Sequence, residues 1–348
     1  MEILNKILEK EEFKKYDKIK DFEIKFYDNS DKEGLMDLYQ SIFPGYMSEE
    51  LWNWKTNKNP YGRFYTILMK EGDKVIASYS VSPKEFYIFG EKYPCVQSMD
   101  TMTDKNYWKR GISTYLANLT YEYSKIVGDF FVYGFPNKNS SHLFEIKLKW
   151  KNFGKIDLLF KDINPEFNIL KSESGFLIKE INKFGNQINE FWNSFKSKFS
   201  IIIKKDETYL NWRFNEHPLV KYKKFLVYNA KSDKIVSFFV LKKFHDNMGQ
   251  QFGHIVDLVI GPQEIQLKKR IFKLIEAHTI NLFKEDCTKI SFWLMDEILK
   301  KMAIDELNYK ITQMETNFGY KIFSTNEKLS ILDSLKNWHI TMANNDVF

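Results

Sequence analysis

The octapeptide NWKTNKNP at residues 53–60 recurs as NWRFNEHP at residues 211–218, so the chain of 348 residues contains an internal repeat. Both copies follow the pattern Asn-Trp-cation-x-Asn-x-x-Pro. The spacing between the copies is far longer than the unit of about 20–50 residues that is typical of solenoid proteins. The repeat therefore predicts two copies of one domain.

The same order of elements follows each copy of the octapeptide. Two apolar runs separated by a polar turn predict a β-hairpin at residues 64–81 and again at 225–240. Each hairpin is followed by a strand, an amphipathic helix, a buried strand, a second helix and a closing strand that starts with NFG. The strands are expected at 96–103 and 254–260, the amphipathic helices at 113–126 and 265–283, and the NFG triplets stand at 152–154 and 317–319. The fold class is therefore predicted as α/β, with two similar domains.

Composition narrows the class of function. The net charge of +6 comes from lysines spread along the chain, which argues against nucleic-acid binding. Cys95 and Cys287 are far apart and lack metal-ligand spacing, so we expect neither a metal site nor redox chemistry. Two distant cysteines fit a protein of the reducing cytoplasm. No apolar run is long enough for a signal peptide or a membrane span. A short amphipathic helix around Ile3 and Leu8 is expected to cap the first domain.

The segment NYWKRGIST at residues 106–114 combines cations, a glycine and hydroxyl groups between a predicted strand and a predicted helix. The first N–H groups of a helix lack intrahelical partners and carry the positive end of the helix dipole, so they attract anions. Gly111 allows close approach to the backbone, Lys109 and Arg110 add charge, and Ser113 and Thr114 add hydroxyl donors. The position predicts a pyrophosphate site; the alternative is a basic turn with a structural glycine.

The segment TDKNYWKRGISTYL resembles the acyl-CoA loop of the GCN5-related N-acetyltransferase (GNAT) superfamily, and GFPNKNSSHLFEIKLKWKNFG resembles the elements that follow it there. Trp108 and Ser113 depart from the residue types usual in that loop. The resemblance covers roughly residues 23–160 and implies tandem GNAT-like domains, each a mixed, mostly antiparallel sheet flanked by helices. It implies an acyl-CoA cofactor such as acetyl-CoA, bound in the first half by Met102, Thr103, Lys109, Arg110, Gly111, Ile112, Ser113, Thr114 and Asn139. The equivalent loop of the second half, VIGPQEIQLKKRI, lacks a cation-glycine pair, so one acyl-CoA site is expected.

The resemblance also implies the catalytic groups. The backbone N–H near Met102 would donate to the thioester oxygen. Asp100 is the expected base, with Glu145 and His142 as further candidates. The superfamily usually protonates the leaving thiolate with a tyrosine, but the expected helix has none, and Phe144 is a candidate for its position. His142 is the expected substitute; the others are Ser140, Ser141, or departure of the thiolate without an enzymic acid.

Each of these assignments competes with a structural role. Asp257 stands where Asp100 does in the other half, which favours a structural carboxylate, and a lone histidine such as His142 is commonly a solvated residue. Asn137 competes with Asn139. Trp54 and Tyr61 could line the acceptor groove, although the octapeptides read most simply as packing and capping. The tail NWHITMANNDVF is expected to dock as an edge strand; in some tandem relatives the C-terminus reaches the acceptor site.

The expected organisation is a helical cap at 1–22, a GNAT-like domain with the acyl-CoA loop at 23–165, a degenerate GNAT-like domain at 166–330 and a tail at 331–348. The expected function is acyl-CoA-dependent N-acylation, with N-acetylation as the expected case, of a small-molecule amine such as an amino sugar or amino acid. Two alternatives remain. One is a peptidoglycan-bridge-type aminoacyl transferase, which would use charged tRNA. The other is a non-catalytic CoA-binding or partner module.

Overall fold

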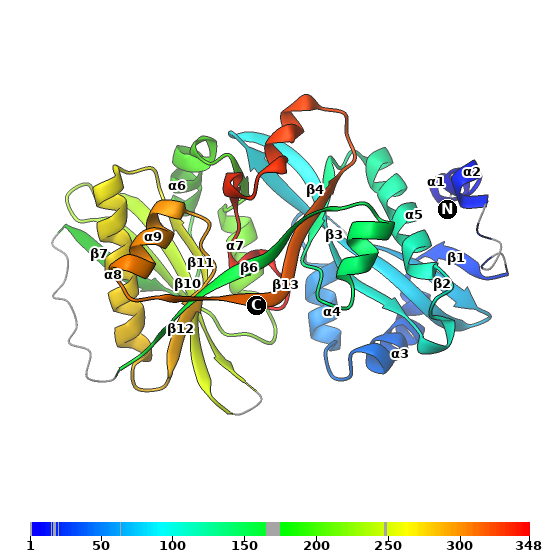
Figure 1. Ribbon diagram of the computed structural model, residues 1–348, viewed down its shortest axis with the longest axis horizontal. Coiled ribbons are helices and arrows are strands. Elements are labelled where there is room, and N and C mark those ends of the chain that lie inside the picture. The colour runs from blue at the N-terminus through cyan, green and yellow to red at the C-terminus, as the bar shows by residue number, and fades with distance from the viewer. Residues whose placement is uncertain are drawn as a thin grey trace. The chain divides into compact units, whose positions relative to one another are not determined.

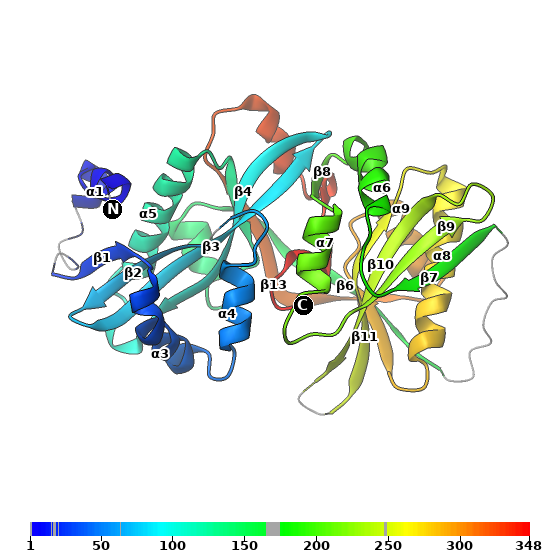
Figure 2. The ribbon, with the colours of Figure 1, turned by 180° about the vertical axis from the view of Figure 1, so that it is seen from behind.

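The computed structural model describes residues 2–14, 16, 19, 21–62, 64–164, 175–246 and 249–348, apart from the side chain of Glu315. The chain divides into two compact units, drawn from two sides in Figures 1 and 2. Unit 1 comprises Met1–Glu85, Tyr93–Gly154 and Thr316–Ser330, and unit 2 comprises Phe86–Lys92, Lys155–Glu315 and Ile331–Phe348. The predicted boundary between residues 165 and 166 lies outside the described residues, so the predicted domain limits stay a prediction.

The sheet of unit 1 has the strand order β1-β2-β3-β4-β5-β13. β2 is antiparallel to β1 and to β3, and β13 is antiparallel to β5. β4 and β5 run parallel, with Val96 opposite Val132 and Gln97 opposite Tyr133. The expected mixed, mostly antiparallel sheet is confirmed, as is the first hairpin. The strands are β1 (Glu23–Phe26), β2 (Tyr65–Glu71), β3 (Lys74–Ile88), β4 (Glu91–Thr103), β5 (Phe131–Gly134) and β13 (Lys310–Ile322).

Helices cover both faces of this sheet. Successive strand residues point to opposite sides, and both sides carry apolar residues that are buried by helices. Ile67 and Met69 of β2 pack in one core cluster with α5 (Ile112–Val127) and α1 (Glu2–Leu8). Leu68, between them, packs on the other face with α3 (Lys32–Ile42) and α4 (Glu49–Thr56). The predicted N-terminal and 113–126 helices are thus confirmed. The remaining helical segments are α2 (Glu11–Lys14), η2 (Asn29–Asp31), η3 (Lys105–Tyr107) and η4 (Leu143–Lys147).

Unit 2 repeats this arrangement with the strand order β6-β12-β11-β10-β9-β7. Its one parallel pair among the described strands of this order is β11 with β12, which corresponds to β4 with β5. α8 (Ile265–Phe283) and α9 (Glu297–Asp305) pack on one face, and the 265–283 helix has the predicted bounds. The strands are β6 (Lys151–Asp162), β7 (Phe176–Ile181), β9 (Lys223–Asn229), β10 (Ile235–His245), β11 (Gln251–Ile260) and β12 (Lys289–Phe292).

The other described elements of unit 2 surround this sheet. α6 (Gln187–Phe195) and α7 (Glu207–Phe214) are seen in front of it in Figure 2, whereas α8 and α9 are in front in Figure 1. The short strand β8 (Ile201–Ile203) pairs with the end of β3 and with β14 (Trp338–His339). The tail therefore contributes a paired strand. The short 3-10 helices are η5 (Lys196–Lys198), η7 (Leu335–Asn337) and η8 (Met342–Asn344), and η6 (Glu327–Asp333) begins in unit 1 and ends in unit 2.

The two closing strands are exchanged between the repeats. β6, which follows the first repeat along the chain, pairs through Leu159–Asp162 with β12 of unit 2. β13, which follows the second repeat, pairs through Gly319–Ile322 with β5 of unit 1. The last strand of each unit's sheet therefore comes from the segment that directly follows the other repeat along the chain.

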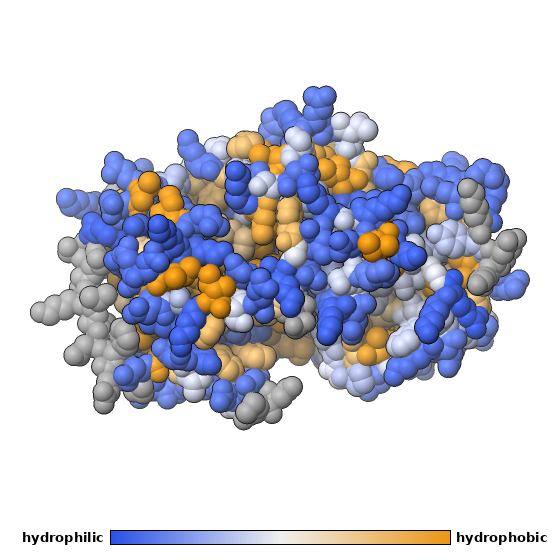
Figure 3. Space-filling model, viewed as in Figure 1, coloured by the Kyte–Doolittle hydropathy of each residue, from blue (hydrophilic) through white to orange (hydrophobic). Residues whose placement is uncertain are grey.

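Hydrophilic side chains cover most of the face drawn in Figure 3. Among the described residues, no helix has the length and apolar character needed to cross a membrane. The described residues also contain no group of three or more His, Cys, Asp or Glu side chains placed to hold a metal ion.

Candidate functional site

The loop from β4 to α5 is held by side chains on both sides of its turn. Asp104 accepts a hydrogen bond from the backbone N–H of Asn106 at 2.9 Å and pairs with Lys74 at 2.6 Å. The buried ring of Tyr107 reaches Glu71 through its hydroxyl, and the guanidinium of Arg110 lies 5.0 Å above that ring. The cationic part of the loop is thus supported by a fixed aromatic platform.

Gly111 sets the start of α5. Its φ of +82° lies in the left-handed region, and a Cβ at this position would meet no described atom within 4 Å. Glycine adopts this conformation without steric cost, and the space beyond it is open. Ile112 is buried and anchors the first turn to the core. The first N–H groups of α5, from Ile112 to Thr114, therefore come just after an uncrowded glycine, as an anion site requires.

The end of β4 contacts this helix start. The Thr103 hydroxyl lies 3.0 Å from the Ser113 hydroxyl, so two predicted cofactor residues meet directly. Trp108 is 56% exposed, and its indole N–H donates to the Thr103 carbonyl at 2.8 Å. Met102 is buried against α3 and α4. The indole therefore takes a fixed place beside the loop, where the superfamily usually has a polar or cationic residue.

Asp100, the expected base, forms a buried ion pair that sequence reasoning missed. Lys55 Nζ lies 3.0 Å from one carboxylate oxygen of Asp100 and 3.3 Å from the other, and the two side chains are 3% and 4% exposed. The same ammonium lies 2.9 Å from the Tyr46 hydroxyl. Asp100 has φ +51°, a backbone conformation that aspartate tolerates better than most residues. The ammonium favours the ionised carboxylate by direct Coulomb attraction.

The segment after β5 carries His142 and Asn139. Asn137 Oδ1 accepts hydrogen bonds from the backbone N–H groups of Asn139 at 3.0 Å and Ser140 at 3.1 Å, so Asn137 shapes the turn. Asn139 and His142 are exposed. The structure gives a short π-helical segment, η4, where the sequence predicts a helix. Phe144 is buried there against Trp150, with ring centroids 4.6 Å apart.

The proposed acceptor residues lie at and after the end of α4. Trp54 is buried within α4 at 5% exposure, and Tyr61 is partly buried. Asn59, between them, donates to the Ser82 hydroxyl at 3.0 Å and accepts from the Tyr61 backbone N–H at 3.1 Å. The octapeptide thus has the packing and turn-forming role that its pattern indicates, and a role in binding an acceptor stays a prediction.

Unit 2 has a second version of the buried ion pair. Lys205 Nζ lies 2.6 Å from Asp257, which stands on β11 where Asp100 stands on β4, and both side chains are fully buried. Burial lowers the pKa of Lys205 from its ordinary value, while Asp257 opposes that shift. The hydroxyl of Thr341, in the tail, donates to Asp257 at 2.9 Å. In this unit the carboxylate is therefore enclosed by protein groups.

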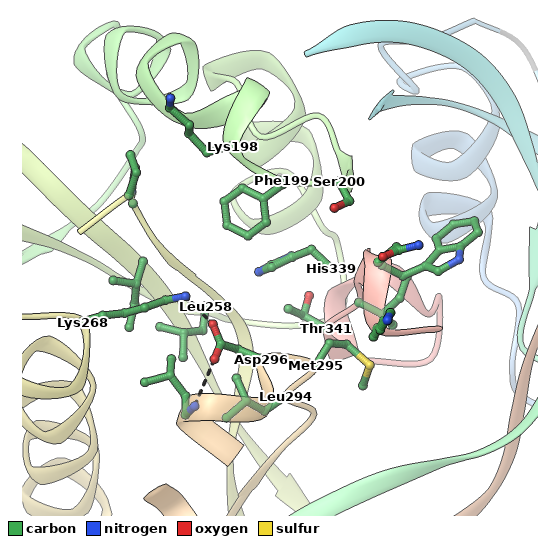
Figure 4. A pocket seen from close by; sticks show the side chains of 18 of the residues that line it. Lys198, Phe199, Ser200, Leu258, Lys268, Leu294, Met295, Asp296, His339 and Thr341 are labelled. Carbon is green, nitrogen blue, oxygen red and sulfur yellow. Dashed lines mark hydrogen bonds and ion pairs between the residues drawn. The ribbon is translucent and has the colours of Figure 1, made fainter. Parts of the chain in front are cut away.

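A cavity of about 330 Å³ lies within unit 2, and Figure 4 shows most of the residues that line it. It lies at the carboxyl ends of β11 and β12, where Ile260, Gly261, Trp293 and Leu294 contribute to its wall. The tail forms another side through Lys336–Thr341. Sequence reasoning missed this cavity; the signals available were Gly261 before a helix and the apolar run KISFWLMD.

Comparison with known proteins identifies the fold. Residues 23–144 match the family model described as the acetyltransferase (GNAT) domain. The chain is similar to a probable N-acyltransferase from Enterococcus faecalis V583 with a TM-score of 0.66 and 11% identity, over 86% of this chain and 72% of that one. A GCN5-related N-acetyltransferase from Anabaena variabilis gives 0.64 and 11%, over 87% and 73%.

Saccharomyces cerevisiae N-myristoyltransferase with bound myristoyl-CoA is also similar, with a TM-score of 0.59 and 14% identity over 87% of this chain and 83% of that one. No curated protein matches the chain. At these identities the structural likeness concerns the fold. Together with the family match, it confirms the GNAT resemblance and the expected fold class.

Proposed function

We propose that the chain is an acyl-CoA-dependent N-acyltransferase, because residues 23–144 match the family model of the acetyltransferase (GNAT) domain. The acyl group is most simply acetyl, and the acceptor is the amine of a small molecule such as an amino sugar or amino acid. Cys95 and Cys287 are buried and form no disulfide with each other, in keeping with a reducing cytoplasm as the place of action.

The observation that carries the proposal is Gly111. It enters α5 at φ +82° with open space where a side chain would stand, directly after Lys109 and Arg110. We assign the pyrophosphate of CoA to this position, held by the first backbone N–H groups of α5 and by the two cations. Asn139, exposed after β5, is assigned to the pantetheine arm.

Bound acyl-CoA supplies the acyl group as a thioester. Around it, the Met102 backbone N–H is assigned to donate to the thioester oxygen, and Asp100 to accept the proton of the acceptor amine. Lys55 holds that carboxylate in place through the buried ion pair at 3.0 Å. His142, exposed at the start of η4, is assigned to protonate the departing sulfur.

The test is ligand-induced stabilisation. Acetyl-CoA and CoA are expected to raise the melting temperature, because a ligand at 100 times its Kd stabilises the folded state by about 2.7 kcal/mol. Arg110→Glu is expected to abolish the shift by placing a carboxylate beside the pyrophosphate. Lys231→Glu, in the exposed β9–β10 turn of unit 2, makes the same charge change outside the loop and is expected to keep the shift.

Thiol release from acetyl-CoA with a panel of amines then separates an enzyme from a binding module. Binding without release with any amine would favour a non-catalytic CoA-binding protein. No shift across a series of acyl-CoAs, together with tRNA binding that weakens steeply with salt, would favour the aminoacyl-transferase alternative.

A further inference from the structure

The cavity of unit 2 lies where α/β proteins commonly bind ligands. β11 and β12 are parallel neighbours, and the cavity is lined by residues at and just beyond their carboxyl ends, such as Ile260 and Trp293. In open α/β sheets, crevices outside the carboxyl ends of the strands are the usual ligand sites. Its volume of about 330 Å³ is at the lower end of the range for small-molecule pockets, which is about 300–1,000 Å³.

One part of the cavity wall is apolar. Leu258, Leu294 and Leu299 line it and are buried to at least 91% within unit 2. The rings of Trp293 and Phe199 also line the cavity. These side chains provide a surface for an apolar ligand body, which gains free energy by leaving water there.

A cation stands at the side of this apolar wall. Lys268 of α8 pairs with Asp296, whose other carboxylate oxygen accepts from the backbone N–H groups of Ile298 at 3.1 Å and Leu299 at 3.0 Å. Figure 4 shows the Lys268 ammonium directed toward Asp296 beside the cavity. Asp296 is thus occupied by the helix start and by Lys268, whereas an ammonium has three donors. Lys268 can therefore also donate to an anionic group.

The lining as a whole favours an anion. The residues that line the cavity include three lysines, Lys198, Lys268 and Lys336, and one acidic residue, Asp296, so their formal charge is +2. Lys198 and Lys336 are exposed at the rim. Their contribution is a positive potential at the entrance rather than a fixed contact.

His339 supplies a hydrogen-bond acceptor. Its ring lies edge to face with Phe199 at 4.9 Å, and Figure 4 shows it extending into the cavity beside that ring. Burial lowers the pKa of His339 to about 4, so the imidazole is neutral at pH 7. The ring interacts with the Leu258 backbone, and its Nδ1 is buried without a hydrogen-bond partner among the described residues. A buried polar atom without a partner is costly, so a ligand donor at this nitrogen is favourable.

We propose that this cavity is a second ligand site that binds a small carboxylate with an apolar body and an adjacent N–H or O–H donor, the chemistry of an N-acylated apolar amino acid. The carboxylate pairs with Lys268, the apolar body lies against the leucines, and the donor meets His339 Nδ1. The site is independent of the acyl-CoA loop in unit 1.

The test uses N-acetyl-L-phenylalanine as the probe in isothermal titration calorimetry on the full chain without CoA. Two analogues examine the two polar contacts: the methyl ester of the probe removes the charge, and N-acetyl-N-methyl-L-phenylalanine keeps the carboxylate and removes the amide N–H donor. Both are expected to bind about tenfold more weakly, which is about 1.4 kcal/mol. Arg110→Glu is expected to bind the probe normally, so that failure of the acyl-CoA proposal and failure of this one are distinguishable.

Lys268→Met keeps the aliphatic stem and removes the charge, and it is expected to weaken binding by about tenfold. Lys273→Met is the matched control, because Lys273 lies on the same helix, also pairs with a carboxylate, Glu306 at 2.8 Å, and does not belong to the cavity lining. His339→Phe keeps an aromatic ring but removes the ring nitrogens. It is expected to bind the probe and the analogue without the N–H donor equally well. Absence of probe binding, or equal binding by folded Lys268→Met, overturns the proposal.

Discussion

The ion pair between Lys55 and Asp100 shows that equivalent residues of the two repeats can have different partners. Lys55 is the cation of the first octapeptide, and Arg213 is the cation of the second. Lys55 pairs with the β4 aspartate directly, whereas the β11 aspartate pairs with Lys205 and the Arg213 guanidinium donates to the Tyr222 hydroxyl at 2.9 Å. The pattern predicted a cation in each repeat, but it did not predict the partners, since Arg213 also donates to the tail carbonyl groups of Ala343 and Asn345, each at 3.2 Å.

Lys55→Met is expected to lower the free energy of unfolding by about 3–5 kcal/mol, because it leaves the buried Asp100 carboxylate without its counter-charge. Urea unfolding measures this loss. Lys32→Met is the control, since Lys32 pairs with Glu49 on the surface, where an ion pair contributes about 1 kcal/mol or less.

The double variant Lys55→Met/Asp100→Asn is expected to recover part of the loss, because it removes the uncompensated charge. If Lys55→Met were as mild as Lys32→Met, the stability of the folded chain would not depend on this pair.

At the scale of elements, the loop before α5 was predictable because its signals are local. The strand before the loop, the glycine and the amphipathic helix after it all stand within a few residues, and the structure gives Gly111 the left-handed conformation that glycine adopts readily. The position of Trp108 was not predictable in the same way, because its indole reaches back to the Thr103 carbonyl, a contact that depends on the path of the turn.

Gly111→Ala is expected to lower the free energy of unfolding by about 1–2 kcal/mol, the cost of a left-handed conformation for a residue with a Cβ. Gly185→Ala is the matched control, because Gly185 does not have a positive φ and a Cβ there meets no described atom within 4 Å. That substitution is expected to be neutral or slightly stabilising through the unfolded state. Equal losses in both variants would contradict a conformational role for Gly111.

At the scale of the whole molecule, buried histidines tie stability to pH. Burial, assisted by nearby Lys242, lowers the pKa of His254 from 6.5 to about 4, and its Nδ1 lies 2.8 Å from the Ser291 hydroxyl. Between pH 6.5 and 4 the unfolded chain therefore binds a proton at this histidine that the folded chain does not. The folded state loses stability as the pH falls through that window.

The expected loss from His254 between pH 7.5 and pH 4.5 is about 2–3 kcal/mol. Urea unfolding of His254→Asn over this range should give a shallower decline than that of the unchanged chain. His245→Asn, at an exposed position of β10, should leave the slope unchanged. A parallel decline in His254→Asn would show that other groups govern acid sensitivity.

The sequence by itself determined the repeat, the hairpins, the two long helices and the place of Gly111 between a strand and the helix that follows it. Each of these depends on periodicity or on neighbours a few residues away, which a linear chain displays. Only the tertiary structure decided that β6 pairs with β12 and β13 with β5, that Lys55 meets Asp100, and that the tail encloses a cavity in unit 2. These contacts join residues far apart in the chain, and their partners are set by how strands and helices pack rather than by any local pattern.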